Sequence, residues 1–225
     1  LGEVVSAKRV LIALKDHYHP QMEALKAAAL QQGGAVGIHA LPSVYPVGDE
    51  QSLVYECTGE AVPPRGLPGA VGCTVVSVST AINALHALAG TPVTRRLVTV
   101  AGEVDRPGLY DVPVGTPIRD VLAAAGGVKV SGARILLGGP MMGELLKEGD
   151  APVVTKTSSG ILVFPQEHQL VNMAGLSLEH MRSRAKSCCI QCRYCTDLCP
   201  RFILGHPIYP HLTMRSFAME SKPEP

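Results

Sequence analysis

The sequence has almost no excess charge and no long apolar run. Its formal net charge is +1 over 225 residues, which argues against a broad nucleic-acid surface, because such a surface needs many unbalanced Lys and Arg. No apolar run approaches the roughly 18–20 residues that a membrane span requires. We therefore expect no transmembrane segment, although attachment to a membrane through a partner stays open. Hydrophobic residues make up 46% of the chain, which is enough for a packed core.

The sequence also lacks an initiating Met and an even, dispersed set of cysteines. It opens on Leu1, with no signal peptide before it, so we expect a fragment of a longer protein. Seven Cys are present. An odd number concentrated in one place is poor evidence for a disulfide framework. It fits a metal site in a reducing compartment better.

Four of the cysteines follow a specific spacing near the C-terminus. Cys189, Cys192, Cys195 and Cys199, followed by Pro200, give Cys-x2-Cys-x2-Cys-x3-Cys-Pro, which is the run of bacterial ferredoxins. In two-cluster ferredoxins the first three thiolates bind one 4Fe-4S cubane and the fourth binds the other. We expect Pro200 to end the local helix, and we expect the second Cys set to lie beyond the last residue.

Two alternatives apply to the cysteines. Structural zinc sites usually pair Cys-x2-Cys knuckles that are far apart in sequence, so zinc fits three thiolates within seven residues less well. Cys188 adjoins the run and is interpreted as a bystander, because neighbouring residues rarely direct both side chains at one metal. Cys57 and Cys73 are interpreted as small core residues.

The N-terminal part predicts a parallel α/β domain. The pattern gives a strand at 8–14, a helix at 18–32 and a strand at 35–40, and a strand–helix–strand unit with short joints favours parallel pairing. The pattern then predicts a short helix at 49–57, a rigid Pro-rich connection and a strand at 73–78. It ends with a helix at 81–89 that is capped by Ser79 or Thr80.

The next part has a different character. Strands at 97–101, 108–112 and 133–137 and a helix at 118–125 predict a small α+β module. Two short strands are expected within 150–165, and one helix at 170–186 leading to the cysteines. The expected fold class is multidomain, α/β and α+β. We place a domain boundary near residue 92, where the character of the sequence changes.

Several motifs occur in one characteristic order. The first motif is Tyr45-Pro46-x-Gly48-Asp49-Glu50, and the second is Thr58-Gly59-Glu60-x-Val62-Pro63. They are followed by Gly66-Leu67-Pro68, by the loop Gly138-Gly139-Pro140-Met141-Met142-Gly143 and by the Cys run. Over nearly the whole chain this order resembles the C subunit of the Rnf electron-transport complex. The residues from Cys195 to Pro207 favour a relative of that subunit, the cobalamin reductase of propanediol-utilising microcompartments. Both are similar, more distantly, to the NADH-binding FMN subunit of respiratory complex I.

The resemblance implies the identity of the domains: a Rossmann-like FMN and NADH domain at 1–92, a β-grasp module at 93–150, connecting strands and a helix at 151–180, and a helical 4Fe-4S ferredoxin-type segment at 181–225. It also implies cofactors and site residues. It implies FMN, NADH and two 4Fe-4S clusters in the full-length protein, with Tyr45, Gly48, Asp49 and Glu50 lining the FMN and nicotinamide pocket. A helix N-terminus with open amides beside Gly48 would suit that pocket, and Thr80 could hydrogen-bond the FMN phosphate.

Two departures and one plain alternative accompany that assignment. Val76-Ser77 stand where the complex I subunit has two Asn, and the family's glycine-rich phosphate loop is absent from this sequence. Asp49 and Glu50 could equally be ordinary first-turn acids of a helix. The sequence gives no histidine a role, and His206 and His211, which flank the cluster segment, are interpreted as surface residues.

The resemblance implies an oxidoreductase that passes electrons from NADH through FMN to 4Fe-4S clusters, with no catalytic side chain assigned and no activity expected of the fragment alone. The acceptor would be corrinoid cobalt, with a corrinoid-dependent enzyme or adenosyltransferase as partner, in the bacterial cytoplasm or a microcompartment. The Rnf-type alternative has membrane redox subunits as partners and a peripheral membrane location. A third hypothesis, from another class, is a ligand-binding adaptor with a structural metal site.

Overall fold

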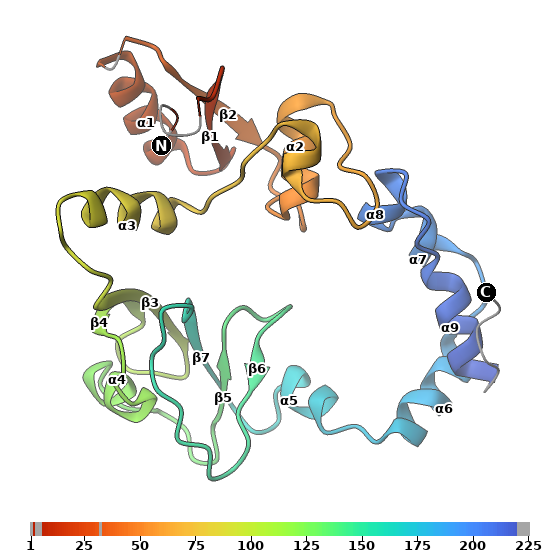
Figure 1. Ribbon diagram of the computed structural model, residues 1–225. Helices are drawn as coiled ribbons and strands as arrows, with labels where there is room; N and C mark the ends of the chain where they lie inside the picture. Colours follow the sequence, from red (N-terminus) through yellow and green to blue (C-terminus); the bar gives the residue numbers. More distant parts are fainter. Residues whose placement is uncertain (1, 3–5, 32, 220–225) are drawn as a thin grey trace. The chain divides into compact units, whose positions relative to one another are not determined.

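The chain folds into two compact units. The computed structural model describes residues 2, 6–31 and 33–219 (Figure 1). One unit combines Leu1–Ala81 with Arg182–Pro225, and the other is Ile82–Met181. Among the described helices, none combines the length and the hydropathy that crossing a membrane needs.

The first unit opens with the predicted strand–helix–strand element. Strand β1 (Val10–Lys15), helix α1 (His19–Gln31) and strand β2 (Val36–Leu41) follow one another, and α1 contacts β2. β1 and β2 pair in parallel, from Val10 opposite Val36 to Lys15 opposite Leu41. The parallel pairing predicted from the sequence is therefore confirmed, and both strands end at the same edge.

The segment after β2 differs from the prediction at one strand and one cap. Helix α2 (Glu50–Thr58) and the short 3-10 helix η1 (Pro68–Val71) form, but residues 73–77 are not a strand. An apolar, β-branched run becomes a strand only where a neighbour accepts its hydrogen bonds, and the described sheet here has two strands only. Helix α3 (Val78–Leu88) begins earlier than predicted, because the Ser77 hydroxyl accepts the Thr80 amide at 3.1 Å.

The second unit holds a five-stranded mixed sheet in the order β4-β3-β7-β5-β6. Its elements are β3 (Arg95–Gly102), β4 (Gly108–Pro113), α4 (Ile118–Ala124), β5 (Arg134–Leu137), β6 (Glu144–Leu145) and β7 (Gly160–Phe164). β3 and β7 are parallel and the other pairs are antiparallel. Figure 1 shows β7 between β3 and β5. The sheet and its helix confirm the predicted α+β module.

The core of this unit lies between the sheet and α4. Val98 and Val100 of β3 and Ile161 and Val163 of β7 are fully buried, and they form one cluster with the inward face of α4. Gly102 is needed where β3 leaves β7, because it has φ +91° and an added Cβ would lie 2.0 Å from the Val163 carbonyl oxygen. A side chain at Gly102 is therefore excluded both by the backbone conformation and by space.

The C-terminal part is helical but more broken than predicted. Its helices are α5 (Gln169–Ala174), α6 (Leu178–Cys188), α7 (Tyr194–Asp197), α8 (Pro200–Ile203) and α9 (Pro210–Met219). The single helix predicted at 170–186 is wrong, because the chain breaks at Gly175 and the Ser177 hydroxyl then accepts the His180 amide at 3.2 Å. Within 150–165 one strand forms, β7, and Val153 makes only an isolated bridge to Pro117.

Candidate iron–sulfur centre and flavin-site residues

Three of the predicted cluster ligands line one cavity. Cys189, Cys192 and Cys195 line an open cavity of about 290 Å³, and helix α9 contributes the rest of its wall. The side chains of Cys192 and Cys195 are exposed. Cys189 follows the end of α6, and Cys195 lies in the first turn of α7. The sequence therefore brings three thiols from one short loop to one opening.

The backbone between these cysteines explains how they converge. Gln191 has φ +55° and Arg193 has φ +67°, so both residues flanking Cys192 adopt the left-handed conformation that costs a non-glycine residue roughly 1–2 kcal/mol. Each left-handed residue reverses the local direction of the chain. Such unfavourable conformations concentrate at functional sites, and here they wrap the loop around the cavity.

Cys199 is separated from the other three thiols. It is half-buried at the N-cap of α8 and does not line the cavity. Pro200 occupies the first position of α8, so it begins a helix instead of ending one as the sequence predicted; its fixed φ and missing N–H suit that position. Cys188, interpreted from sequence as a bystander, does line the cavity.

The described residues do not form a site for a single metal ion. Across the described residues, no three His, Cys, Asp or Glu side chains gather closely enough to hold one metal ion. A cubane has an iron at each of four corners, so its thiolate ligands attach at separate points and stay farther apart than ligands of one zinc ion. Three thiols at one cavity are the donors that this Cys spacing supplies to one iron–sulfur cubane.

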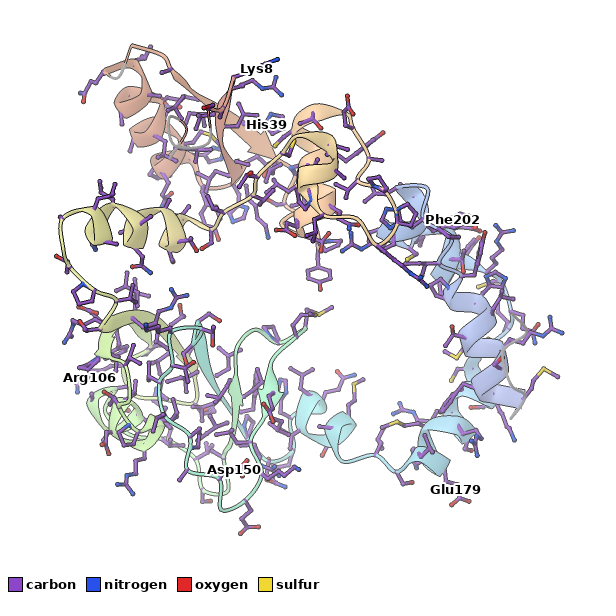
Figure 2. The ribbon with its side chains drawn as sticks, in the orientation of Figure 1. Lys8, His39, Arg106, Asp150, Glu179 and Phe202 are labelled. Atoms are coloured by element: carbon purple, nitrogen blue, oxygen red, sulfur yellow. The ribbon has the colours of Figure 1, made fainter. Side chains whose placement is uncertain are left out.

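Basic and apolar side chains complete the cavity wall. Arg193 and Arg215 line it, together with Ile190 and Leu212. The Arg193 guanidinium also lies 5.8 Å from the ring of Phe202 on α8, which Figure 2 labels. Thiolates and sulfides carry negative charge, which nearby guanidinium groups stabilise. Arg193 also forms an ion pair of 3.2 Å with Asp197, so part of its charge is already offset.

Asp49 has two structural roles. It is the N-cap of α2, where its Oδ1 accepts the amides of Gln51 at 3.1 Å and Ser52 at 3.4 Å. Its Oδ2 accepts a hydrogen bond of 2.8 Å from Arg201 of α8. Two of the helix amides expected to lie open beside Gly48 are therefore bonded by the side chain of Asp49, which is the N-cap residue, while Glu50 is the acid of the first turn.

A second set of contacts joins the α2 segment to the α8 segment. Gln51 accepts a hydrogen bond from Arg201 and donates one of 3.2 Å to the Gly66 carbonyl. His206, only 5% exposed, bonds through Nε2 to the Val62 carbonyl at 2.8 Å. The surface position expected for His206 is wrong, because its ring fills the join between these segments and satisfies a buried carbonyl.

The remaining predicted flavin residues lie on the surface. Tyr45 is 64% exposed, Gly48 and Glu50 are exposed, and an added Cβ at Gly48 would meet nothing within 4 Å. Thr80 lies in the first turn of α3, where its hydroxyl is 2.9 Å from that of Ser77. Between Thr80 and the loop 45–50, the described contacts include no hydrogen bond.

The sequence analysis did not identify a polar pair formed by Asp16 and Ser43. Asp16 follows β1 and Ser43 follows β2, so both lie at the carboxyl edge of the parallel pair, where α/β sheets bind ligands. The Ser43 hydroxyl donates to Asp16 at 2.6 Å and also contacts His17 Nδ1. The hydrogen bond from Ser43 lowers the pKa of Asp16 below its usual range. This pair could have been predicted from the two expected strands, because ligand-binding residues tend to lie at the carboxyl edge of a parallel sheet.

Comparison with known families defines the class of the chain. Residues 1–86 match the Nuo51 FMN-binding domain, residues 97–145 the SLBB domain, and residues 188–225 the 4Fe-4S dicluster domain. The fold and the cysteine cavity agree with this order. The chain is thus a modular assembly of flavin-type, SLBB and iron–sulfur regions.

Curated relatives make the resemblance specific. The chain is 44% identical over 211 residues to cobalamin reductase PduS of Citrobacter freundii and, at the same identity and length, to that of Salmonella typhimurium. Each alignment covers 93% of this chain and 46% of the relative. The predicted resemblance to cobalamin reductase is confirmed, and the chain spans about half the length of these relatives.

Solved structures agree on the fold. The NAD+-reducing [NiFe]-hydrogenase in its H2-reduced state matches with a TM-score of 0.64 at 21% identity, covering 97% of this chain and 44% of that one. The air-oxidized state matches with a TM-score of 0.60 at 22% identity, covering 88% and 40%. At these identities the match supports the multidomain fold alone.

Proposed function

We propose that this chain is part of an oxidoreductase that carries electrons from NADH through FMN to 4Fe-4S clusters and on to corrinoid cobalt. The observation that carries the proposal is the cavity where Cys189, Cys192 and Cys195 converge, in a chain that is 44% identical to cobalamin reductases. FMN supplies the step from a two-electron hydride to single electrons, and 4Fe-4S clusters carry the single electrons onward.

The residues of this chain would hold the groups in distinct ways. Cys189, Cys192 and Cys195 would bind one cubane as thiolates, and Cys199, directed elsewhere at the head of α8, would bind another. The guanidinium of Arg193 would offset the negative charge of the first cluster. Cys188 lines the same cavity, so its thiol is an alternative donor for the fourth iron corner.

The flavin assignment has narrower support. Tyr45 and Gly48 lie in the loop before α2 and Glu50 is the first residue of α2; all three are exposed, which leaves room for a flat ring system. Thr80 and Ser77 place two hydroxyls at the N-terminus of α3, an arrangement that suits a phosphate. Asp49 would act indirectly, because its carboxylate is already shared between the α2 amides and Arg201.

The arrangement also suggests how electrons would leave the flavin region. Asp49, Gln51 and Val62 of the FMN-type region contact Arg201 and His206 of the cluster segment, all within one compact unit. These contacts would keep the loop 45–50 near the chain that binds the clusters. Electron transfer rate depends steeply on distance, so fixing this separation is a useful task for the protein.

The regions, partner class and location follow from the same argument. We assign 1–92 to the flavin and NADH domain and 181–225 to the cluster segment. We extend the β-grasp module, predicted at 93–150, to include β7 from the predicted connection 151–180, because β7 pairs with β3 and β5. The partner would be a corrinoid-dependent enzyme or an adenosyltransferase. The location would be the bacterial cytoplasm or a microcompartment.

The test begins with anaerobic reconstitution of the chain with iron and sulfide. We expect bound iron, acid-labile sulfide and visible charge-transfer absorption that bleaches with dithionite. Cys192→Ala should abolish the absorption, whereas Cys73→Ala, a half-buried cysteine outside the cavity, should not. No NADH-dependent activity is expected of the chain alone, but its chemically reduced cluster, freed of dithionite, should then pass electrons to cobalamin. A colourless zinc-binding product would instead support the adaptor hypothesis.

A further inference from the structure

His211 of helix α9 lies against the cysteine cavity and is fixed by a buried threonine. His211 lines the cavity together with Cys189, Cys192 and Cys195. Thr196, which follows the last of these cysteines, is completely buried. The Thr196 hydroxyl oxygen lies 2.7 Å from His211 Nδ1 and accepts the His211 backbone amide at 3.0 Å.

These two hydrogen bonds determine where the imidazole carries its proton. Because the Thr196 oxygen already accepts the backbone amide, its own hydroxyl proton needs an acceptor, as buried hydroxyls do. Within the described contacts of Thr196, Nδ1 of His211 is the acceptor available. A ring that accepts at Nδ1 is neutral and carries its proton on Nε2.

The remaining ring nitrogen is therefore a donor. Nδ1 contacts buried Thr196 and Nε2 lies across the ring from it, so Nε2 is the ring nitrogen left for a group in the cavity that His211 lines. No hydrogen bond to Nε2 is made within the described part of the chain. A protonated Nε2 can donate a hydrogen bond, but it cannot coordinate iron.

We propose that His211 is a positioning residue that donates its Nε2–H to a sulfur of the cluster bound by Cys189, Cys192 and Cys195. This inference rests on the proposed ligand set. Hydrogen bonds to cluster sulfurs set the reduction potential. A reduced cluster carries one more negative charge, so the donor stabilises the reduced form more than the oxidised form. His211 would thus raise the potential, and Thr196 would maintain the tautomer that makes this possible.

The experiment is a redox titration, monitored by EPR, of the full chain reconstituted anaerobically. His211→Leu keeps an apolar side chain but removes the donor. At the wild-type midpoint potential, the ratio of oxidised to reduced cluster in this variant should be about tenfold higher than in the wild type. This corresponds to a midpoint potential lowered by about 59 mV for one electron. Thr196→Val should shift the potential in the same direction by less, and Thr196→Ser should restore the wild-type value. His180→Leu on α6, whose ring does not line the cavity, is the matched control.

The outcomes separate this inference from the proposed ligands. If the wild-type chain holds no iron, the assignment of Cys189, Cys192 and Cys195 as cluster ligands is wrong. If His211→Leu holds full iron and its potential equals that of the wild type, the inference about His211 is overturned. Should that variant fail to load, pulsed EPR of the wild type decides: a weak nitrogen coupling with a deuterium-exchangeable proton supports the donor, and the strong coupling of a coordinated nitrogen overturns it.

Discussion

The contact between Asp49 and Arg201 should hold the α2 segment against the cluster segment. Both side chains are 32% exposed, and the ion pair is 2.8 Å long. Exposed pairs contribute about 0.2–1 kcal/mol, and this one is better shielded and shared with Gln51, so we take about 1 kcal/mol. Loss of the Asp49 N-cap would add about 1 kcal/mol.

Three substitutions separate these two contributions. Asp49→Asn keeps a capping oxygen, since Asn and Asp cap about equally well, and removes the charge. Arg201→Met removes the other charge, and Asp49→Ala removes both the charge and the cap. We expect losses of about 1 kcal/mol for each of the first two and about 2 kcal/mol for the third.

Hydrogen–deuterium exchange is the suitable assay, because a chain of two units need not unfold in one step. Amides of α2 should exchange about fivefold faster in Asp49→Asn and in Arg201→Met, since 1 kcal/mol is about a factor of five. In a double-mutant cycle the double variant should be no worse than either single one. Fully additive effects, or unchanged exchange in Arg201→Met, would refute the contact as an energetic link.

Other substitutions test the local arguments. Gln191→Gly should retain wild-type iron content after reconstitution, whereas Gln191→Val should lose it, because a β-branched residue does not tolerate φ +55°; equal iron in both would remove the role given to this turn. Burial raises the pKa of the Cys57 thiol, so at pH 8.5 iodoacetamide should label Cys57 more slowly in the folded chain than in urea, and equal rates would contradict that shift. Gly102→Ala should destabilise the second unit by about 3 kcal/mol or more, from backbone strain and overlap, measured as a lower thermal midpoint of that unit; a midpoint unchanged from the wild type would show that β3 and β7 separate freely.

Local pattern was sufficient for much of the fold. The alternation and helix breakers around 8–40 and 97–137 predicted the parallel pair and most of the mixed sheet, because each element there has a partner close in the sequence. The failures occurred where the outcome depends on distant partners. The run 73–78 has strand propensity but no neighbouring strand, and the helix expected at 170–186 is divided by Gly175 and the capping hydroxyl of Ser177.

The candidate site likewise has a part that local sequence predicts and a part that depends on residues distant in sequence. Ligand spacing alone placed Cys189, Cys192 and Cys195 together and set Cys199 apart, since both follow from the geometry of one short loop. Spacing could not predict that Arg201 reaches Asp49 across 152 positions, nor that His206 is buried against Val62. These contacts depend on the packing of segments distant in sequence, which no local motif records.

The central claim is that this chain binds a redox-active iron–sulfur cluster through the cavity cysteines. The most direct measurement is the EPR spectrum of the anaerobically reconstituted chain before and after dithionite, beside the same spectra of Cys192→Ala. We predict a paramagnetic signal of a one-electron-reduced 4Fe-4S cluster in the wild type and none in the variant. A reduced wild-type chain that is EPR-silent and holds zinc in place of iron would contradict the claim.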